Sequence, residues 1–142
     1  MRVTPEEITV EMLLENDNIV CVIPTNETGI HGAGMAQWAR RKFGLPSGVG
    51  FGPTGKTSLI FFCIPTKDWK IKQLSLEVIQ FYILRFIEYA KIGAHLIFYV
   101  PKIGCGLAGY TPEQMAPMFK TCVNLPNVYL PQEFWDILNK EQ

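Results

Sequence analysis

Two glycine-rich turns follow short apolar runs in this sequence of 142 residues. The first turn, Gly32-Ala33-Gly34, comes shortly after the β-branched run at residues 19–24, and the second, residues 104–109, comes after the run at residues 96–100. Small residues at the start of a helix let backbone N–H groups approach a phosphate at the positive end of the helix dipole. Two such turns at the ends of parallel strands can hold a diphosphate between them.

A lysine stands at the end of a further apolar run, in the sequence Pro65-Thr66-Lys67-Asp68. A lysine amine that a cleft partly removes from water can attack or polarise a reacting carbon. The alternative is a surface lysine that pairs with Asp68, a common arrangement at strand ends. The residues alone leave both interpretations of Lys67 open.

Residues 50–57 match the phosphate-binding pattern G-x-x-x-x-G-K-T. That loop works only between a strand and a helix, because the helix N-terminus must face the phosphates. Here a segment rich in glycine and proline precedes the pattern, and an apolar strand is predicted after it. No apolar strand in the sequence ends in the acidic residue that would hold magnesium. We therefore reject a nucleoside triphosphatase.

Apolar periodicity places these motifs on alternating strands and helices. The sequence predicts strands at residues 19–24, 58–64, 96–100 and 128–130, and helices at residues 34–43, 74–91, 112–120 and 131–139. Residues 45–56 are predicted to form a loop. This alternation implies a central, largely parallel sheet covered on both faces, with ligands at the carboxyl ends of its strands. The segments 26–34, 65–68 and 103–109 would then surround one cleft of a single domain, residues 1–142.

The composition limits the classes of function. Apolar residues make up 48% and charged residues 18%, which excludes native disorder. Thirteen basic and 13 acidic side chains cancel, so any contact with DNA must be local, as Arg40, Arg41, Lys42 and Lys56 could provide. Four cysteines without a C-x-x-C pair, and only two histidines, predict no metal site. The polar N-terminus and the lack of a membrane-length run lead us to expect a cytoplasmic protein with reduced thiols.

Three segments together resemble the signature loops of macrodomains, in the correct order and at strand ends. They are residues 24–36 (PTNETGIHGAGMA), 64–69 (IPTKDW) and 100–109 (VPKIGCGLAG). The likeness covers about residues 12–130 and is greatest to the DarG-type DNA ADP-ribosyl glycohydrolases, which are antitoxins, and their phage and bacterial relatives. It implies a three-layer α/β/α sandwich with a mixed, mostly parallel sheet. It also implies ADP-ribose binding and hydrolysis of an ADP-ribosyl linkage, with a nucleobase of DNA as the suggested substrate, and no cofactor.

The resemblance implies a catalytic role for Lys67 and a ligand-binding role for residues of all three loops. The implied binding residues are Asn26, Gly29, His31, Gly32, Ala33, Gly34, Met35, Pro65, Thr66, Ile103, Gly104, Cys105, Gly106, Leu107, Ala108, Gly109 and Tyr110. Asn26 would contact the distal ribose or, alternatively, shape its loop through an Asx-turn. His31 would touch a phosphate, although a place on the rim is favoured. For Cys105 a backbone role is favoured over a nucleophilic one, and Tyr110 would cover the ligand or cap the core.

The sequence departs from the macrodomain pattern at two positions. Met12 stands where the family carries an aspartate that selects the adenine amino group, and Glu11 beside it would point to the opposite face of a strand. Ala108 stands where the branch that acts on acidic side chains carries an aspartate, although the DarG-like branch also has a small residue there. Two other functions stay open: a binder that sequesters ADP-ribose or another NAD-derived nucleotide without turnover, and an ADP-ribose 1''-phosphate phosphatase.

Overall fold

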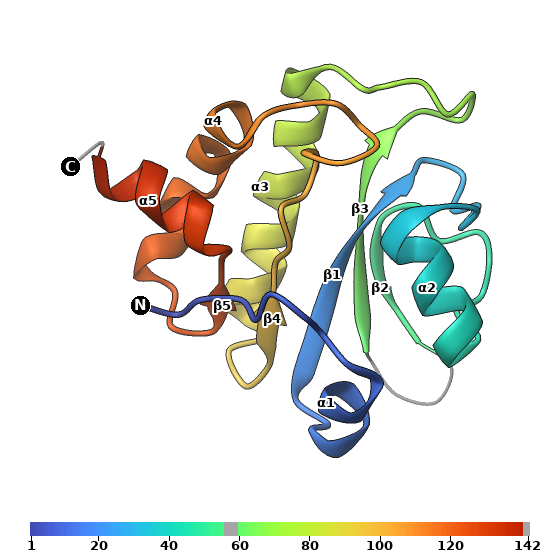
Figure 1. Cartoon of the computed structure of the whole chain (residues 1–142), viewed down its shortest axis with the longest axis horizontal. Helices are drawn as coiled ribbons and strands as arrows, with labels where there is room; N and C mark the ends of the chain where they lie inside the picture. The colour runs from blue at the N-terminus through green and yellow to red at the C-terminus, as the bar shows by residue number, and fades with distance from the viewer. Residues whose placement is uncertain (56–59, 141–142) are drawn as a thin grey trace.

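A five-stranded sheet forms the centre of the computed structural model, which describes residues 1–55 and 60–140 (Figure 1). Its strands lie in the order β2-β3-β1-β4-β5, and their bounds are β1 (Ile19–Asn26), β2 (Gly52–Thr54), β3 (Phe61–Lys67), β4 (Ile97–Tyr99) and β5 (Val128–Tyr129). β1 pairs in parallel with β3 and β4, β4 pairs in parallel with β5, and β2 is antiparallel to β3. The predicted mixed, mostly parallel sheet is confirmed.

Helices cover both faces of this sheet, which confirms the three-layer arrangement (Figure 1). They are α1 (Val10–Glu15), α2 (Gly34–Phe43), α3 (Leu76–Ile92), α4 (Pro112–Met115), the 3-10 helix η1 (Ala116–Asn124) and α5 (Gln132–Lys140). Successive side chains of β1 pack into two hydrophobic cores, one on each face of the sheet. Val20 and Val22 pack with α3, η1 and α5, whereas Cys21 and Ile23 pack with α1 and α2. This alternation explains why the run at residues 19–24 is apolar throughout.

The sequence locates α2 at its observed bounds, Gly34–Phe43. The helix ends because Gly44 adopts a left-handed conformation, with φ of 66°, and donates its N–H to the carbonyl of Arg40. At the other end Ala33 is the N-cap residue and provides no side-chain hydrogen bond to the first turn. The first turn also lacks an acidic residue. The N–H groups at the start of α2 are therefore left for an external acceptor.

Two predictions around the edge of the sheet are wrong. Residues 45–56 were predicted as a loop, but Gly52–Thr54 forms the edge strand β2, where Pro53 is tolerated. The prediction that Pro65 breaks its strand is also wrong, since β3 continues to Lys67. β2 pairs only as far as Cys63, so no β2 carbonyl lies opposite the missing N–H of Pro65. The predicted start of this strand at Ser58 lies outside the described residues, as do Lys56 and Thr57 of the rejected phosphate-binding pattern.

Two helical segments also differ from expectation. Glu11 and Met12 were placed on a strand, but they lie in α1, which begins where the Thr9 hydroxyl accepts the N–H of Met12 at 3.2 Å. The helix predicted at residues 112–120 is α-helical only through Met115 and continues as η1. Pro117 accounts for this change, because proline cannot continue an α-helical hydrogen-bond ladder. None of the helices in the described part of the chain is long and apolar enough to cross a bilayer.

Candidate functional site

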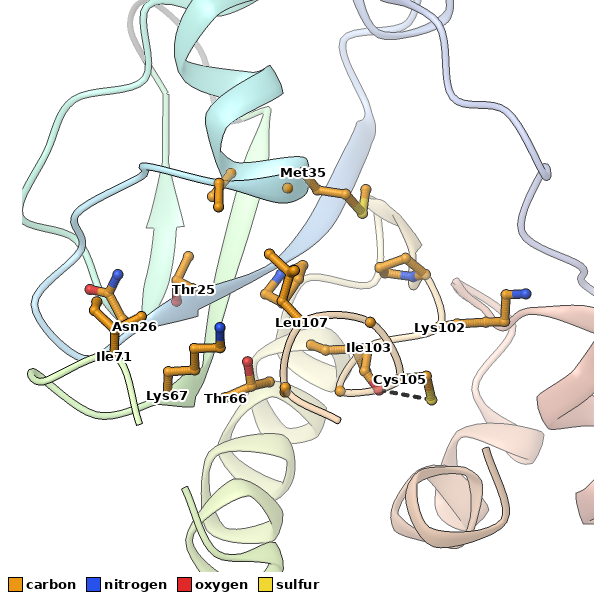
Figure 2. Close-up of a pocket in the computed structure, with 18 of the residues that line it drawn as sticks. Thr25, Asn26, Met35, Thr66, Lys67, Ile71, Lys102, Ile103, Cys105 and Leu107 are labelled. Carbon is orange, nitrogen blue, oxygen red and sulfur yellow. Dashed lines mark hydrogen bonds between the residues drawn. The ribbon is translucent and has the colours of Figure 1, made fainter. Parts of the chain in front are cut away.

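A cleft of about 810 Å³ opens where β1 and β3 end, between the three loops singled out in the sequence (Figure 2). The start of α2 forms one wall, and the loop after β4 forms another. Lys67 and Asn26 lie towards one end in Figure 2, and Cys105 and Lys102 lie towards the other. The volume is in the range of small-molecule sites in proteins. The sequence-based expectation of one shared cleft is therefore supported by the geometry.

Asn26 lies at the end of β1 and is 8% exposed. Its Oδ1 accepts the Thr28 hydroxyl at 2.7 Å and the Ile30 N–H at 3.1 Å, and its Nδ2 donates to the Ile30 carbonyl at 2.6 Å. These bonds are the loop-shaping role that the Asx-turn interpretation predicts. Because Nδ2 carries two hydrogens, one further donor is not used in these bonds. The same side chain can hold the loop and donate to a ligand.

The loop after β4 faces the start of α2 across the cleft. Gly104 has φ of 79°, and its carbonyl accepts the N–H of Tyr110 at 2.8 Å, which closes the loop. A Cβ at Gly34 would lie 3.5 Å from Cδ1 of Leu107, so the Leu107 side chain reaches towards the start of α2. The two glycine segments both line the cleft, where backbone N–H groups from either segment can donate to one ligand.

This third loop is tied to the connection between β3 and α3. The Gln73 side-chain amide donates to the carbonyl of Ala108, and the Tyr110 hydroxyl donates to the carbonyl of Leu74 at 2.5 Å. Tyr110 packs against the larger core and does not line the cleft in the described structure, which favours its role as a core cap. Two side-chain hydrogen bonds therefore link the second and third loops beside Lys67.

The Lys67 side chain is half-buried and points into the cleft (Figure 2). Its backbone carbonyl accepts the N–H of Glu27 at 2.9 Å, which joins the end of β3 to the first loop. Asp68 instead uses Oδ1 to accept the backbone N–H groups of Lys70 at 2.8 Å and Lys72 at 2.9 Å. No ion pair joins Lys67 to any residue within 1–55 or 60–140. The surface-pair alternative for Lys67 and Asp68 is not what the structure shows.

Most of the residues that the resemblance implicated line the cleft: Asn26, Gly32, Ala33, Gly34, Met35, Thr66, Lys67, Ile103, Gly104, Cys105, Gly106, Leu107 and Ala108. Five lie outside its lining: Gly29, His31, Pro65, Gly109 and Tyr110. Sequence reasoning missed nine lining residues, namely Pro24, Thr25, Ile30, Ala36, Ile71, Pro101, Lys102, Pro112 and Glu133. Six of them lie within residues 24–36 and 100–109, the segments that resemble macrodomain loops, although no binding role was assigned to them. Glu133, however, comes from α5 and reaches the cleft through its ion pair with Lys102, at 3.1 Å.

Cys105 lines the cleft with a protonated thiol. Burial, with a smaller contribution from the charge of Glu133, raises the pKa of Cys105 to about 11. The thiol contacts the carbonyl of Ile103 at 3.6 Å (Figure 2). A thiol with this pKa is a poor nucleophile at neutral pH, so the geometry favours the backbone role that was expected for this position.

His31 is buried and does not line the cleft, so the expectation that it lies on the rim is wrong. The side chain is 2% exposed, and neither ring nitrogen has a hydrogen-bond partner among the described residues. Burial lowers the pKa of His31 below 6.5, and the positive charge of Arg40 lowers it further, against an opposing effect of the Pro46 backbone. The folded protein therefore holds His31 neutral near pH 7.

This buried imidazole predicts a loss of stability in mild acid. Below pH 6.5 the unfolded chain takes up a proton at His31 that the folded chain resists, so the free energy of unfolding should fall as the pH drops from 7 towards 5. One proton contributes at most about 1.4 kcal/mol per pH unit. Urea unfolding at several pH values should show a flatter profile for His31→Leu than for the wild type. Identical pH profiles for His31→Leu and the wild type would contradict the assignment of this effect to His31. His95→Gln serves as the control, because His95 is exposed.

A second cavity, of about 840 Å³, adjoins the cleft on the side of Lys102. The two share Met35, Pro101, Lys102 and Glu133, and the second is completed by residues 3–8 of the N-terminal segment. Thr4 anchors that segment, because its hydroxyl donates to the Val100 carbonyl at 2.7 Å. Glu6 and Glu7 line this cavity, whereas neither Glu11 nor Met12 lines either cavity in the described structure.

Two further expectations concern charged groups. Arg40, Arg41 and Lys42 occupy the last turn of α2, the end opposite to the one that lines the cleft, and Lys56 lies outside the described residues. A basic patch on the cleft formed by α2 is therefore not observed. Within residues 1–55 and 60–140, no group of three or more histidine, cysteine, aspartate or glutamate side chains could hold a metal ion.

The sheet order and the two helical layers form a three-layer α/β/α fold, and comparison with solved structures shows that macrodomains share this fold. The chain is similar to the macrodomain of Mycobacterium tuberculosis DarG, with 20% identity and a TM-score of 0.64 over 92% of this chain and 95% of that chain. It is also similar to Thermosipho africanus DarTG in complex with ADP-ribose, with 20% identity and a TM-score of 0.59 over 82% of this chain and 38% of that chain.

A third similar structure is a protein of unknown function from Bacteroides thetaiotaomicron, with 15% identity and a TM-score of 0.62 over 80% of this chain and 86% of that chain. No protein-family model and no curated protein sequence matches the chain. The similarity at these identities is a similarity of fold.

Proposed function

We propose that this protein binds ADP-ribose in the cleft and hydrolyses an ADP-ribosyl linkage with the help of Lys67. The observation that carries the proposal is the juxtaposition of three features in one cleft: the uncapped start of α2, the glycine loop after β4, and a lysine side chain that points between them. The similar DarTG structure contains ADP-ribose, which supports the choice of ligand.

The diphosphate of the ligand fits between the two glycine segments. The N–H groups at the start of α2 have no side-chain cap, and the helix dipole places partial positive charge there. Gly104 and Gly106 of the loop after β4 also line the cleft, and their backbone N–H groups are the proposed donors from that loop. The distal ribose then lies towards Asn26, whose remaining amide hydrogen can donate to a ribose hydroxyl.

In this orientation the other end of the ligand points towards the second cavity. Lys102 and Glu133 belong to the wall that the two cavities share. Lys102 lies opposite to Asn26 and Lys67 in Figure 2. Glu6 and Glu7 line the second cavity, and a carboxylate accepts hydrogen bonds from an exocyclic amino group. We therefore assign adenine recognition to this N-terminal segment, because Met12 occupies the position of the aspartate that recognises adenine in macrodomains.

Lys67 acts at the anomeric carbon of the distal ribose. In the covalent form of the step, the free amine forms a bond to that carbon, while the bond to the modified group breaks and its electron pair leaves with that group, which takes up a proton. Water then displaces the lysine and releases ADP-ribose. In the alternative form, the charged ammonium polarises the leaving group while water attacks directly. A nucleobase of DNA is the proposed modified group.

A turnover assay distinguishes this function from its two rivals. Three substrates are incubated with the protein: an ADP-ribosylated single-stranded oligonucleotide, a peptide ADP-ribosylated on glutamate, and ADP-ribose 1''-phosphate. Release of free ADP-ribose from the oligonucleotide is the expected result. Recovery of every substrate intact would favour a non-catalytic binder, and release of inorganic phosphate from the third substrate would favour the phosphatase.

A further inference from the structure

The loop that follows Lys67 presents an unusual surface to solvent. Residues 67–73 read KDWKIKQ, and we call them the 67–73 loop. Trp69 is 65% exposed and Ile71 is 49% exposed, while Lys70 and Lys72 are exposed as well. An indole is costly to leave in water. Its exposure beside lysines therefore suggests a partner that offers both flat apolar rings and negative charge.

Hydrogen bonds within the 67–73 loop define its conformation, and its backbone is strained at Ile71. The N–H of Asp68 donates to the Lys72 carbonyl at 2.8 Å, and the N–H of Ile71 donates to the Asp68 carbonyl at 3.0 Å. The Asp68 carboxylate accepts two further backbone N–H groups, from Lys70 and Lys72. Ile71 has φ of 64°, a left-handed conformation that is rare for a β-branched residue. Such strain persists where the surroundings enforce it, and it clusters at functional sites.

The charge of the loop is locally positive although the whole chain is neutral. The loop contains Lys67, Lys70 and Lys72 but one acidic residue, Asp68, whose Oδ1 accepts two backbone N–H groups. The acidic residue of the first loop, Glu27, accepts a hydrogen bond from the Tyr82 hydroxyl at 2.6 Å. With 13 basic and 13 acidic side chains overall, only a local field such as this one attracts a polyanion.

Trp69 is suited to stacking, and the loop leads directly to the cleft. The Nζ of Lys70 lies 4.8 Å from the centroid of the indole ring, so cation and ring are presented together. Ile71 and Lys67, on either side of these residues, both line the cleft. A flexible strand that stacks a base on Trp69 therefore has its neighbouring bases beside the mouth of the cleft. Single-stranded nucleic acid combines stackable bases with phosphates at this spacing.

We infer that the 67–73 loop is a docking site for single-stranded nucleic acid, with Trp69 as the stacking surface and Lys70 and Lys72 as phosphate contacts. The site binds an unmodified strand, so it does not depend on ADP-ribose binding or on hydrolysis. Trp69, Lys70 and Lys72 are absent from the described lining of the cleft, which keeps the two activities separable by mutation.

The test is fluorescence anisotropy with a labelled, unmodified ten-nucleotide deoxythymidine strand at several salt concentrations. Trp69→Ala should weaken binding roughly 5- to 150-fold, the range for loss of one base–aromatic stack. The double variant Lys70→Ala/Lys72→Ala should make the slope of log affinity against log salt shallower by about 1.4, or about 0.7 for each lost phosphate contact to a single strand.

Phe81→Ala is the matched control, because Phe81 is also an exposed aromatic ring and the Arg85 guanidinium lies 5.4 Å from its centroid. It should leave strand binding unchanged. The proposal is overturned if the wild type does not bind the strand, if Trp69→Ala binds as tightly as the wild type, or if polyglutamate of equal charge competes as well as the strand. The rise in unfolding temperature with ADP-ribose, measured on Trp69→Ala, checks folding and the cleft separately.

Discussion

Lys67→Ala should lower the rate of ADP-ribose release by a factor on the order of 10² to 10⁴, the usual contribution of one positioned acid, base or nucleophile. ADP-ribose affinity should change by only a few-fold, since the proposed diphosphate contacts come from the backbone of α2 and of the loop after β4. The side chain points into the cleft and no ion pair joins it to the described residues, so its removal leaves no described charge unpaired.

Two further variants divide the possible mechanisms. Lys67→Arg keeps the positive charge but lacks a free amine at accessible pH, so it should stay inactive in the covalent mechanism and retain part of the rate if the charge alone polarises the leaving group. Lys91→Ala, on the exposed ion pair with Glu88, is the matched lysine control. Unchanged turnover in a folded, ADP-ribose-binding Lys67→Ala protein would refute the catalytic role.

A pair of glycine substitutions in the first loop should separate folding from binding. Gly29 has φ of 74°, and a Cβ there would lie 2.6 Å from the carbonyl carbon of Gly48 and overlap the backbone of Val49. Gly29→Ala should therefore lower the free energy of unfolding by about 2–6 kcal/mol, the sum of backbone strain and overpacking. In a chain of this size each kcal/mol corresponds to roughly 3–5 °C in the unfolding temperature.

Gly32→Ala should instead weaken ADP-ribose binding and leave the stability of the fold nearly unchanged. A Cβ at Gly32 meets nothing within 4 Å, so the free energy of unfolding should stay within about 0.5 kcal/mol of the wild type. Gly32 lines the cleft, however, and the added methyl group holds the diphosphate away from the start of α2. Loss of one charge-assisted hydrogen bond would weaken ADP-ribose binding by roughly 10- to 150-fold. Thermal unfolding and calorimetric titration measure the two effects, and equal responses of both variants would contradict this division.

The elements that the sequence located best are those with strong local signals. α2 lies between a small-residue turn and Gly44, and Phe43 and Gly44 mark its end in sequence as they do in the structure. The strands β1 and β3 are continuous apolar runs because both faces of the sheet are covered. Since parallel strands place their carboxyl ends at one edge, the convergence of the loops that follow them was predictable as well.

The misplaced elements lack such local signals or depend on distant contacts. β2 is rich in glycine and proline, and only its pairing with β3 makes it a strand. The burial of His31 arises from tertiary packing that no neighbouring residue reveals. α1 is an exception, because Thr9, a typical N-cap residue, marks its start in the sequence.

The second cavity could not be predicted from the sequence, because contacts between distant residues form it. Its N-terminal wall is held by Thr4 against Val100 and by the backbone of Arg2 and Thr4 against Leu130, contacts that span most of the chain. The Lys102–Glu133 pair likewise joins a loop to α5. Charged residues at such separations carry no pattern that predicts their pairing.

The central claim is that the cleft recognises ADP-ribose as a whole, and isothermal titration calorimetry of the wild-type protein tests it most directly. Titrations with ADP-ribose, ADP and ribose 5-phosphate are compared at one pH and salt concentration. We expect saturable binding of one ADP-ribose per chain, with ADP bound more weakly because it lacks the distal ribose that Asn26 and Lys67 are placed to contact. Absence of saturable heat with ADP-ribose, or equal affinity for ADP, would contradict the account.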